Sequence, residues 1–365
     1  MAVLDYHLPR SPLTPAPIEI SYRDEGNGNG PFYDHYTIQR ATFQETVVSL
    51  PPQMTTQALV SFIKTGTTHN LWFGPFSEEG KRIPRVSQPT DSVGLLVIPG
   101  HARESETKRA DMLEIRNLHE RLLLRDAFKR GRPVLGICAG SWQIWNVFNA
   151  IVQFRIKEET ADLVFDGTTP VKDHAWRQMP TINNDGSIGH NVQMHSVSIP
   201  SHSMLAGMAT DSWQAYKKQS ASLQQIHPDL HLLVNSVHWK APSKYSLPRT
   251  EETLMKKGAP HFRDILQVNA TSLPPGENTP KGKAPEADVI EGFELTSGAP
   301  ILGIEWHPEA YNDDWQPNSR FCRSLLVYMA KAGDAYLAKQ KMLASLKEKI
   351  EMNALSSLLK NMHLR

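Results

Sequence analysis

The stretch Pro133-Val-Leu-Gly-Ile-Cys138-Ala-Gly140 decides the fold. Its apolar run Val134–Ile137 is typical of a strand buried on both faces, and it leads directly into a cysteine flanked by small residues. A helical pattern follows at once, over Ala139–Ile151. A strand that turns sharply into a helix at Cys138 is the thiol form of a nucleophile elbow, because the helix N-terminus lowers the thiol pKa. For this segment alone, a buried structural cysteine at a strand end is the alternative.

The same alternation of strand and helix precedes this stretch. Val93–Ile98 (VGLLVI) predicts another buried strand, and Ser105–Arg130 keeps helical spacing until Gly131 and Pro133 end it. Strand, helix, strand, helix indicates an α/β protein with a parallel sheet. The other expected elements are a helix over Gln57–Thr65 and strands over Thr46–Leu50, Asn70–Phe73, His195–Ile199, Leu232–Val234, Leu266–Val268 and Ile301–Trp306.

Three parts of the chain differ in composition. Residues 1–45, rich in Pro, Gly, Asn and Tyr, predict an N-terminal extension that lies over the domain. Residues 46–330 form the main domain, with Pro- and Lys-rich surface insertions within 241–287. Residues 331–365 predict an amphipathic helical tail that docks on the domain or on a second subunit, so that we expect a homodimer through this helix; a helix lying on a membrane surface is the alternative.

The composition excludes several classes of protein. With 39 Lys and Arg against 38 Asp and Glu, a formal charge of +1 gives no reason to expect a nucleic-acid partner. No apolar run is long enough to span a membrane, and the first residues do not resemble a secretory signal. The only two cysteines, Cys138 and Cys322, exclude a disulfide scaffold and a four-cysteine zinc site, and they fit a reducing, cytoplasmic location. We expect Cys322 to lie in the core side of the helix Phe321–Met329.

Two further segments bring groups that a cysteine nucleophile needs. In Gly303-Ile-Glu-Trp-His307-Pro-Glu309, a strand delivers a histidine as base, and the glutamate two residues later can orient it. A metal-binding pair is the alternative, but no third ligand stands at a supporting spacing. In Val97-Ile-Pro99-Gly100-His101, a turn after a strand can aim backbone N–H groups at an oxyanion. All three segments end a predicted strand, where sites form in open α/β sheets.

The Pro-Gly turn, Gly-x-Cys-x-Gly and Trp-His-Pro-Glu, in this order, resemble the class I glutamine amidotransferase-like superfamily. Within it the chain is most similar to the gamma-glutamyl hydrolase group, including gamma-glutamyl-GABA hydrolases. Weaker likenesses are His195-Ser-Val-Ser-Ile, Val234-Asn-Ser-Val-His238 and the strands around Val268–Ala270 and Val289–Glu291, so that the resemblance covers about residues 90–330. It implies a flavodoxin-like three-layer sandwich with a mostly parallel central sheet.

The resemblance also implies an activity. Cys138, His307 and Glu309 would form the catalytic triad, and the backbone N–H groups of Gly100, His101 and Ala139 would bind the oxyanion. The substrate would be a small-molecule or peptide gamma-glutamyl amide, cleaved through a glutamyl thioester. The implied chemistry uses no metal and no organic cofactor.

Departures from the family pattern concern the substrate pocket. Trp142 stands where glutamine amidotransferases commonly have Gln; Gln143 comes one residue later and, about 100° around a helix, should point elsewhere. The family's His-His-Gln reads His238-Trp239-Lys240. The residues predicted to contact substrate are His101, Trp142, Asn235, Ser236, His238 and Trp239, while His174, His190 and His195 either line the pocket or serve the structure.

Two other functions stay open at this point. One is a glutaminase or amidotransferase subunit that supplies ammonia to a partner, whose glutaminase activity would rise when that partner binds. The other is a protein-binding or protein-modifying member of the superfamily, which would use the insertions and the C-terminal helix for recognition. The joint presence of Cys138, His307 and Glu309 argues against an inactive protein, because a binding module has no need of all three.

Overall fold

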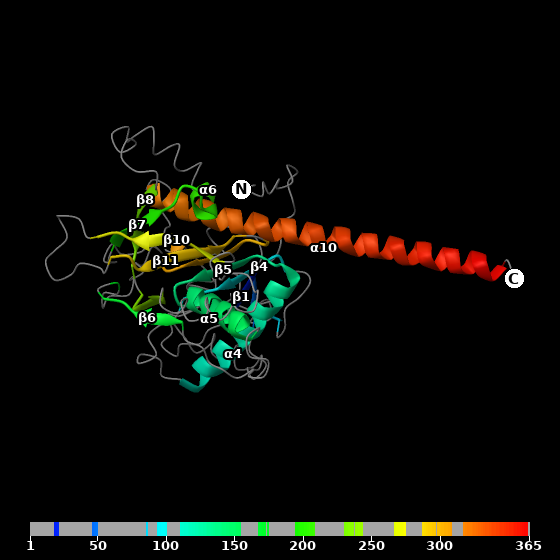
Figure 1. Ribbon diagram of the computed structural model, residues 1–365, viewed down its shortest axis with the longest axis horizontal. Coiled ribbons are helices and arrows are strands. Elements are labelled where there is room, and N and C mark those ends of the chain that lie inside the picture. The colour runs from blue at the N-terminus through cyan, green and yellow to red at the C-terminus, as the bar shows by residue number, and fades with distance from the viewer. Residues whose placement is uncertain are drawn as a thin grey trace, which may run out of the picture.

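Figure 1 shows a mixed α/β body from which one long helix projects. The computed structural model describes residues 18–21, 46–49, 85–86, 93–100, 110–154, 167–172, 174, 194–208, 230–236, 238–243, 266–274, 287–296, 298–308 and 317–363. Several predicted features lie outside these residues: the helix Gln57–Thr65, the strand Asn70–Phe73, the residues His101, His190 and Glu309, and most of the insertions within 241–287.

Within these residues, one sheet of ten strands forms the centre of the protein, in the order β3-β2-β1-β4-β5-β12-β11-β10-β7-β8. Its strands are β1 (Ile18–Ser21), β2 (Thr46–Ser49), β3 (Arg85–Val86), β4 (Leu95–Ile98), β5 (Val134–Ile137), β7 (Met194–Ile199), β8 (Leu230–Asn235), β10 (Leu266–Ser272), β11 (Ile290–Leu295) and β12 (Ile301–Ile304). A small second sheet pairs β6 (Thr168–Pro170) with β9 (Lys240–Pro242) in antiparallel orientation.

The large sheet is parallel in one half only. Neighbours from β3 to β12 run parallel, as the sequence predicts, whereas β12, β11, β10, β7 and β8 pair antiparallel. The connection from β11 to β12 is only residues 296–300, which is too short for the crossover of a dozen or more residues that a parallel pair requires. Chain connectivity therefore accounts for the antiparallel pairing of β11 with β12.

Helices cover both faces of the parallel half. Leu95 and Val97 of β4 share a buried cluster with Phe321 and Leu325 of α10 (Pro317–His363). The alternate residues Leu96 and Ile98 pack on the other face, in a second cluster with α4 (Ala110–Arg130) and α5 (Ala139–Phe154). The side chains of a strand alternate between faces, so these two clusters define a three-layer arrangement. A short helix, α6 (Met204–Met208), also contacts α10.

The segment Ile18–Ser21 differs from expectation. Residues 1–45 are predicted to form an extension lying over the domain, but β1 is an inner strand of the sheet, paired in parallel with β2 on one side and β4 on the other. Ile18 is buried in the cluster beneath α10. This part of the predicted extension therefore belongs to the sheet.

The C-terminal helix α10 is continuous from Pro317 to His363. Its first part packs on the sheet, and Cys322 is fully buried there, which confirms its predicted place in the core. From residue 341 to 357 every residue is exposed, and this half extends away from the body in Figure 1. The predicted boundary between residues 330 and 331 falls inside this helix, and both that boundary and the homodimer stay predictions. Among the described helices, none is long and apolar enough to cross a membrane.

Candidate active site

Three adjacent parallel strands bring the predicted catalytic segments to one edge of the sheet. The register pairs Ile98 of β4 with Gly136 of β5, and Ile137 of β5 with Ile304 of β12. The carboxyl ends of β4, β5 and β12 therefore lie side by side. The residues that follow these ends are Gly100, Cys138 and His307.

Cys138 has the backbone conformation expected of a nucleophile at a strand–helix turn. Its φ of 51° lies in the left-handed region that side-chain-bearing residues rarely adopt. Its N–H donates to the carbonyl of Ile304 at 2.7 Å, and its own carbonyl accepts from the N–H of Ser141 at 2.8 Å. These two hydrogen bonds join the end of β12 and the first turn of α5 to Cys138. The surrounding backbone thus holds the strained residue in place.

Gly100 marks how close Cys138 and His307 come to each other. A Cβ built on Gly100 would lie 3.1 Å from Cβ of Cys138, 2.8 Å from Cε1 of His307 and 3.3 Å from Nε2 of His307. Both functional side chains therefore border the same small space above the end of β4, and a side chain at position 100 would fill it.

Asn235, at the end of β8, fixes the backbone of His307. Its side-chain carbonyl accepts from the N–H of His307 at 2.8 Å, and its amide donates to the His307 carbonyl at 2.9 Å. Asn235 is a predicted substrate residue, but in this structure both ends of its amide are engaged with His307. It is therefore a positioning residue for the histidine.

Replacing Asn235 with alanine should lower the free energy of unfolding by about 1–3 kcal/mol, because two backbone groups lose their partner at a largely buried position. Chemical denaturation measures this loss. Asparagine to aspartate should not rescue it, since a carboxylate oxygen would then face the His307 carbonyl that Nδ2 now contacts at 2.9 Å. Wild-type stability in both variants would contradict the positioning role.

Residues in the first turn of α5 contact Glu305, which follows β12. The Ser141 hydroxyl donates to Oε1 of Glu305, and the Trp142 indole N–H donates to Oε2 at 2.8 Å. Burial raises the pKa of Glu305 to about 8, although these donors and the nearby His238 favour the ionised form. Trp142 also meets the ring of Trp239 edge-on, with centroids 5.3 Å apart. Both tryptophans are predicted to contact substrate, and the structure brings their rings together.

Gln143 points away from this region, as the 100° helical step predicts. Its amide donates to Oδ1 of Asn117 in α4 at 2.9 Å. The neighbouring residues Trp142 and Gln143 therefore have different partners: Trp142 contacts Glu305, and Gln143 contacts α4.

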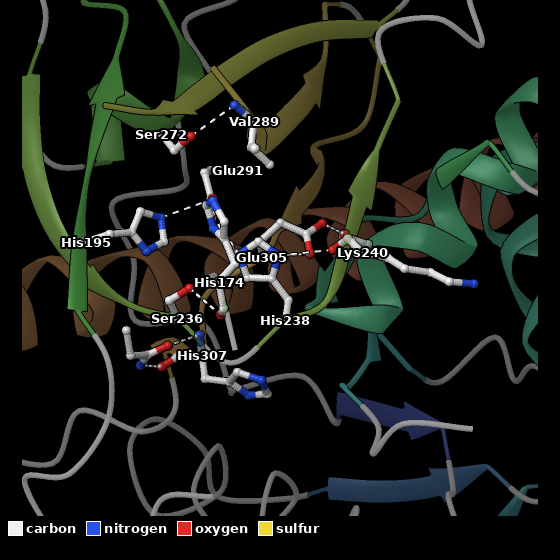
Figure 2. Close-up of polar contacts among 12 residues, drawn as sticks. His174, His195, Ser236, His238, Lys240, Ser272, Val289, Glu291, Glu305 and His307 are labelled. Carbon is white, nitrogen blue, oxygen red and sulfur yellow. Dashed lines mark hydrogen bonds and ion pairs between the residues drawn. The ribbon is translucent and has the colours of Figure 1, made fainter. Parts of the chain in front are cut away.

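Next to Glu305 lies a fully enclosed group, which we call the His–Glu cluster: His174, His195, His238 and Glu291 (Figure 2). Oε1 of Glu291 lies 3.1 Å from Nδ1 of His174 and 3.1 Å from Nε2 of His195. Oε2 of Glu291 lies 3.3 Å from Nε2 of His238. The three imidazoles therefore converge on one carboxylate.

The electrostatics of the cluster favour charged forms despite its burial. Burial alone would raise the pKa of Glu291, but His238 and His195 hold it well below its usual range. Burial alone would lower the pKa of His238, yet the charge of Glu291 raises it above the ordinary histidine value. The cluster is thus a site where positive charge is stabilised inside the protein.

Four separate segments build the cluster. The segment 167–174 pairs with 238–243 through β6 and β9, and the N–H of His238 donates to the His174 carbonyl at 3.2 Å. His195 comes from β7 and Glu291 from β11. Sequence reasoning left His174 and His195 between a pocket role and a structural role, and it treated Glu291 only as part of a strand. Because the four residues come from distant segments, no spacing in the sequence could reveal the cluster.

The remaining predicted site residues have clear positions where the structure describes them. Ala139 begins α5 directly after Cys138. Ser236 donates from its hydroxyl to the His174 carbonyl at 2.5 Å, and His238 is wholly buried in the cluster. His101 and Glu309 lie outside the described residues. The catalytic, oxyanion and substrate-binding roles of these residues stay predictions.

Comparisons with known proteins return similar folds among solved structures. The glutaminase domain of Trypanosoma brucei CTPS with bound acivicin is 12% identical over 87% of this chain and 93% of that domain, with a TM-score of 0.43. A glutamine amidotransferase from Thermotoga maritima is 15% identical over 90% of this chain and 98% of that one, with a TM-score of 0.37. A glutamine amidotransferase from Methylobacillus flagellatus is 13% identical over 90% of this chain and 95% of that one, with a TM-score of 0.37.

No protein-family model matches the sequence, and no curated protein matches it. The closer similarity to gamma-glutamyl hydrolases stays a prediction. The solved structures that match are glutaminase or glutamine amidotransferase chains, each at low identity and low TM-score.

Proposed function

We propose that this protein is a cysteine-dependent hydrolase that cleaves gamma-glutamyl amide bonds in a peptide or an amine conjugate. The observation that carries the proposal is the convergence of Gly100, Cys138 and His307 at the carboxyl ends of three adjacent strands. A left-handed cysteine at a strand–helix turn, beside a histidine, is the arrangement that thiol acyl-transfer chemistry needs.

The proposed reaction has two steps. His307 accepts the proton of the Cys138 thiol, and the thiolate sulfur attacks the gamma-carbonyl carbon. The oxyanion accepts hydrogen bonds from the N–H of Ala139 and from the Gly100–His101 turn, each such donor being worth about 3 kcal/mol of barrier. His307 then protonates the leaving amine as the C–N bond breaks. Water, deprotonated by His307, hydrolyses the glutamyl thioester and releases glutamate and the free thiol.

Two features of the surroundings support this assignment of roles. Asn235 anchors His307 through its backbone, so the imidazole starts from a fixed point. The N-terminus of α5 directly follows Cys138, and its positive end favours a thiolate. Glu309 is proposed to hold the second nitrogen of His307, by the family resemblance and by its place two residues after the base.

A paired panel of substrates tests the proposal. We expect the purified protein to release the amine from gamma-glutamyl amides and peptides, and to leave the matching alpha-glutamyl isomers intact. Glutamine belongs in the same panel, because hydrolysis of glutamine alone would favour a glutaminase. Equal cleavage of alpha and gamma isomers, or of none of them, would overturn the proposed specificity.

Gly100→Ala tests whether Gly100, Cys138 and His307 lie as close together as the structure describes. The added methyl would lie 2.8 Å from Cε1 of His307, so the imidazole must move away from Cys138. We expect kcat/KM to fall by about 10²-fold, the scale that misplacing a catalytic group by about 1 Å produces. The thermal midpoint should change little, because the imidazole can yield. Gly207→Ala, where no atom lies within 4 Å of the added methyl, is the matched control and should keep full activity.

A further inference from the structure

We propose that the His–Glu cluster of His174, His195, His238 and Glu291 binds one Zn²⁺ ion. The site would be structural, enclosed beneath the candidate active site, and separate from the catalytic groups. The inference stands on the geometry of the four side chains and is independent of the proposed hydrolase function.

The spacing of the donor atoms fits a small tetrahedral cation. Zinc–nitrogen and zinc–oxygen bonds of about 2.0–2.1 Å place the corners of a regular tetrahedron about 3.3–3.4 Å apart. Nδ1 of His174 lies 3.2 Å from Nε2 of His238. Oε1 of Glu291 lies 3.1 Å from the nitrogens of His174 and His195, and Oε2 lies 3.3 Å from Nε2 of His238. All four donor atoms, one from each residue, lie within 4.8 Å of one another, so the side chains would close around the ion when it binds.

Hydrogen bonding leaves part of the cluster unsatisfied. Both ring nitrogens of His195 and both oxygens of Glu291 are buried without a hydrogen-bond partner, although Nε2 of His195 lies 3.1 Å from Oε1. Nε2 of His195 and Oε1 of Glu291 are thus close enough for a hydrogen bond but lack the angles that one requires. Buried polar atoms without partners cost free energy, and a cation bound by Nε2 of His195 and one oxygen of Glu291 would remove that cost for these two atoms.

The tautomer of His238 leads to the same conclusion. Its Nδ1 faces the Lys240 carbonyl at 3.0 Å, and since a carbonyl oxygen only accepts, Nδ1 carries a proton. With the proton on Nδ1, the neutral ring has its Nε2 lone pair directed into the cluster, 3.3 Å from Oε2 of Glu291, as a metal ligand requires. A ligating histidine whose other nitrogen donates to a backbone carbonyl is the usual outer-shell arrangement of zinc sites.

The environment fits a structural site. The four side chains are buried, and the four ligands fill a tetrahedral shell without leaving a position for water or substrate. The neighbours shown in Figure 2 fix the ligands from outside: Ser236 holds the backbone of His174, and the Glu305 backbone N–H donates to the Glu291 carbonyl at 2.8 Å. The ion would thus join β7, β11 and the β6–β9 sheet at one point.

Metal content of the full-length protein tests the proposal directly. Protein purified from zinc-supplemented cells should contain about one Zn²⁺ per chain by elemental mass spectrometry. His202→Ala, a change at an exposed histidine outside the cluster, should keep this content. His195→Ala and Glu291→Gln should each lose most of it. Zinc that persists in both ligand variants at the wild-type level would place the ion elsewhere and overturn the proposal.

A second measurement uses only the wild-type chain, since ligand variants can fail to fold. Unfolded protein refolded with Zn²⁺ should melt at least about 5 °C higher than protein refolded with a chelator, because the ion binds the folded state. Co²⁺ in place of Zn²⁺ should give the intense visible absorption of a tetrahedral site. The proposal would be overturned by a zinc content below about one tenth of an ion per chain, together with equal melting temperatures and no cobalt spectrum. The cluster would then be held by hydrogen bonds and ion pairs without a metal.

Discussion

Replacing Cys138 with alanine is expected to reduce the hydrolysis of a gamma-glutamyl amide by about 10⁴-fold or more, because the nucleophile that forms the thioester is gone. Activity is measured as kcat/KM for amine release. The fold should survive, since alanine keeps the Cβ and the two backbone hydrogen bonds that hold residue 138. Turnover above about a tenth of the wild-type rate would contradict the assignment of Cys138 as the nucleophile.

Two variants separate loss of chemistry from loss of structure. Cys322→Ala removes the other buried thiol, which lies in α10, and should leave kcat/KM unchanged. Cys138→Gly should be as inactive as the alanine variant but more stable than it by about 1–2 kcal/mol, because glycine adopts a φ of 51° without strain. Equal stabilities of the alanine and glycine variants would argue against stored backbone strain at this turn.

Gly140→Ala is expected to have the largest effect on stability. A Cβ at this position would overlap the carbonyl oxygen of Ile98, a backbone atom at the end of β4 that cannot rotate away. Either α5 must move off the sheet or the strand must shift, and overpacking of this kind costs about 1–3 kcal/mol or more. Chemical denaturation should show a lower midpoint with an unchanged slope. Activity should fall as well, because α5 begins immediately after Cys138.

Gly207→Ala supplies the comparison for this change too. Gly207 lies in α6, no atom stands within 4 Å of the added methyl, and alanine favours helix over glycine by about 0.5–1 kcal/mol. It should therefore be neutral or slightly stabilising. A Gly140→Ala protein as stable as the wild type would mean that α5 and β4 do not pack as closely as the structure describes.

The parallel half of the fold was predictable from local sequence. The strand Val134–Ile137 agrees with β5 residue for residue, because Pro133 and the cysteine turn bound a short apolar run on both sides. The run Val93–Ile98 includes β4, and the helix predicted to end at Gly131 does end there, where φ is +64°. These elements carry their own boundary signals, so pattern and structure coincide.

Features that depend on distant pairing could not be predicted in the same way. The strand Ile18–Ser21 (IEIS) lacks the continuous apolar run that marks β5, and it is held in the sheet by its neighbours β2 and β4. The antiparallel half follows from strand order, which the apolar pattern of a single strand does not encode. The His–Glu cluster gathers residues from β7, from β11 and from the two segments of the small sheet, so only the three-dimensional structure reveals it.

Intact-mass analysis after treatment with a glutamine-like diazoketone tests the central claim most directly. We predict one covalent adduct on the wild-type protein, mapped by peptide analysis to Cys138, and none on Cys138→Ala. That result requires both an activated thiol and a pocket that accepts a gamma-glutamyl-shaped group. If a general thiol alkylator labels Cys138 but the diazoketone does not, the gamma-glutamyl specificity is contradicted. If neither reagent labels Cys138, the protein is not a cysteine hydrolase of the kind proposed.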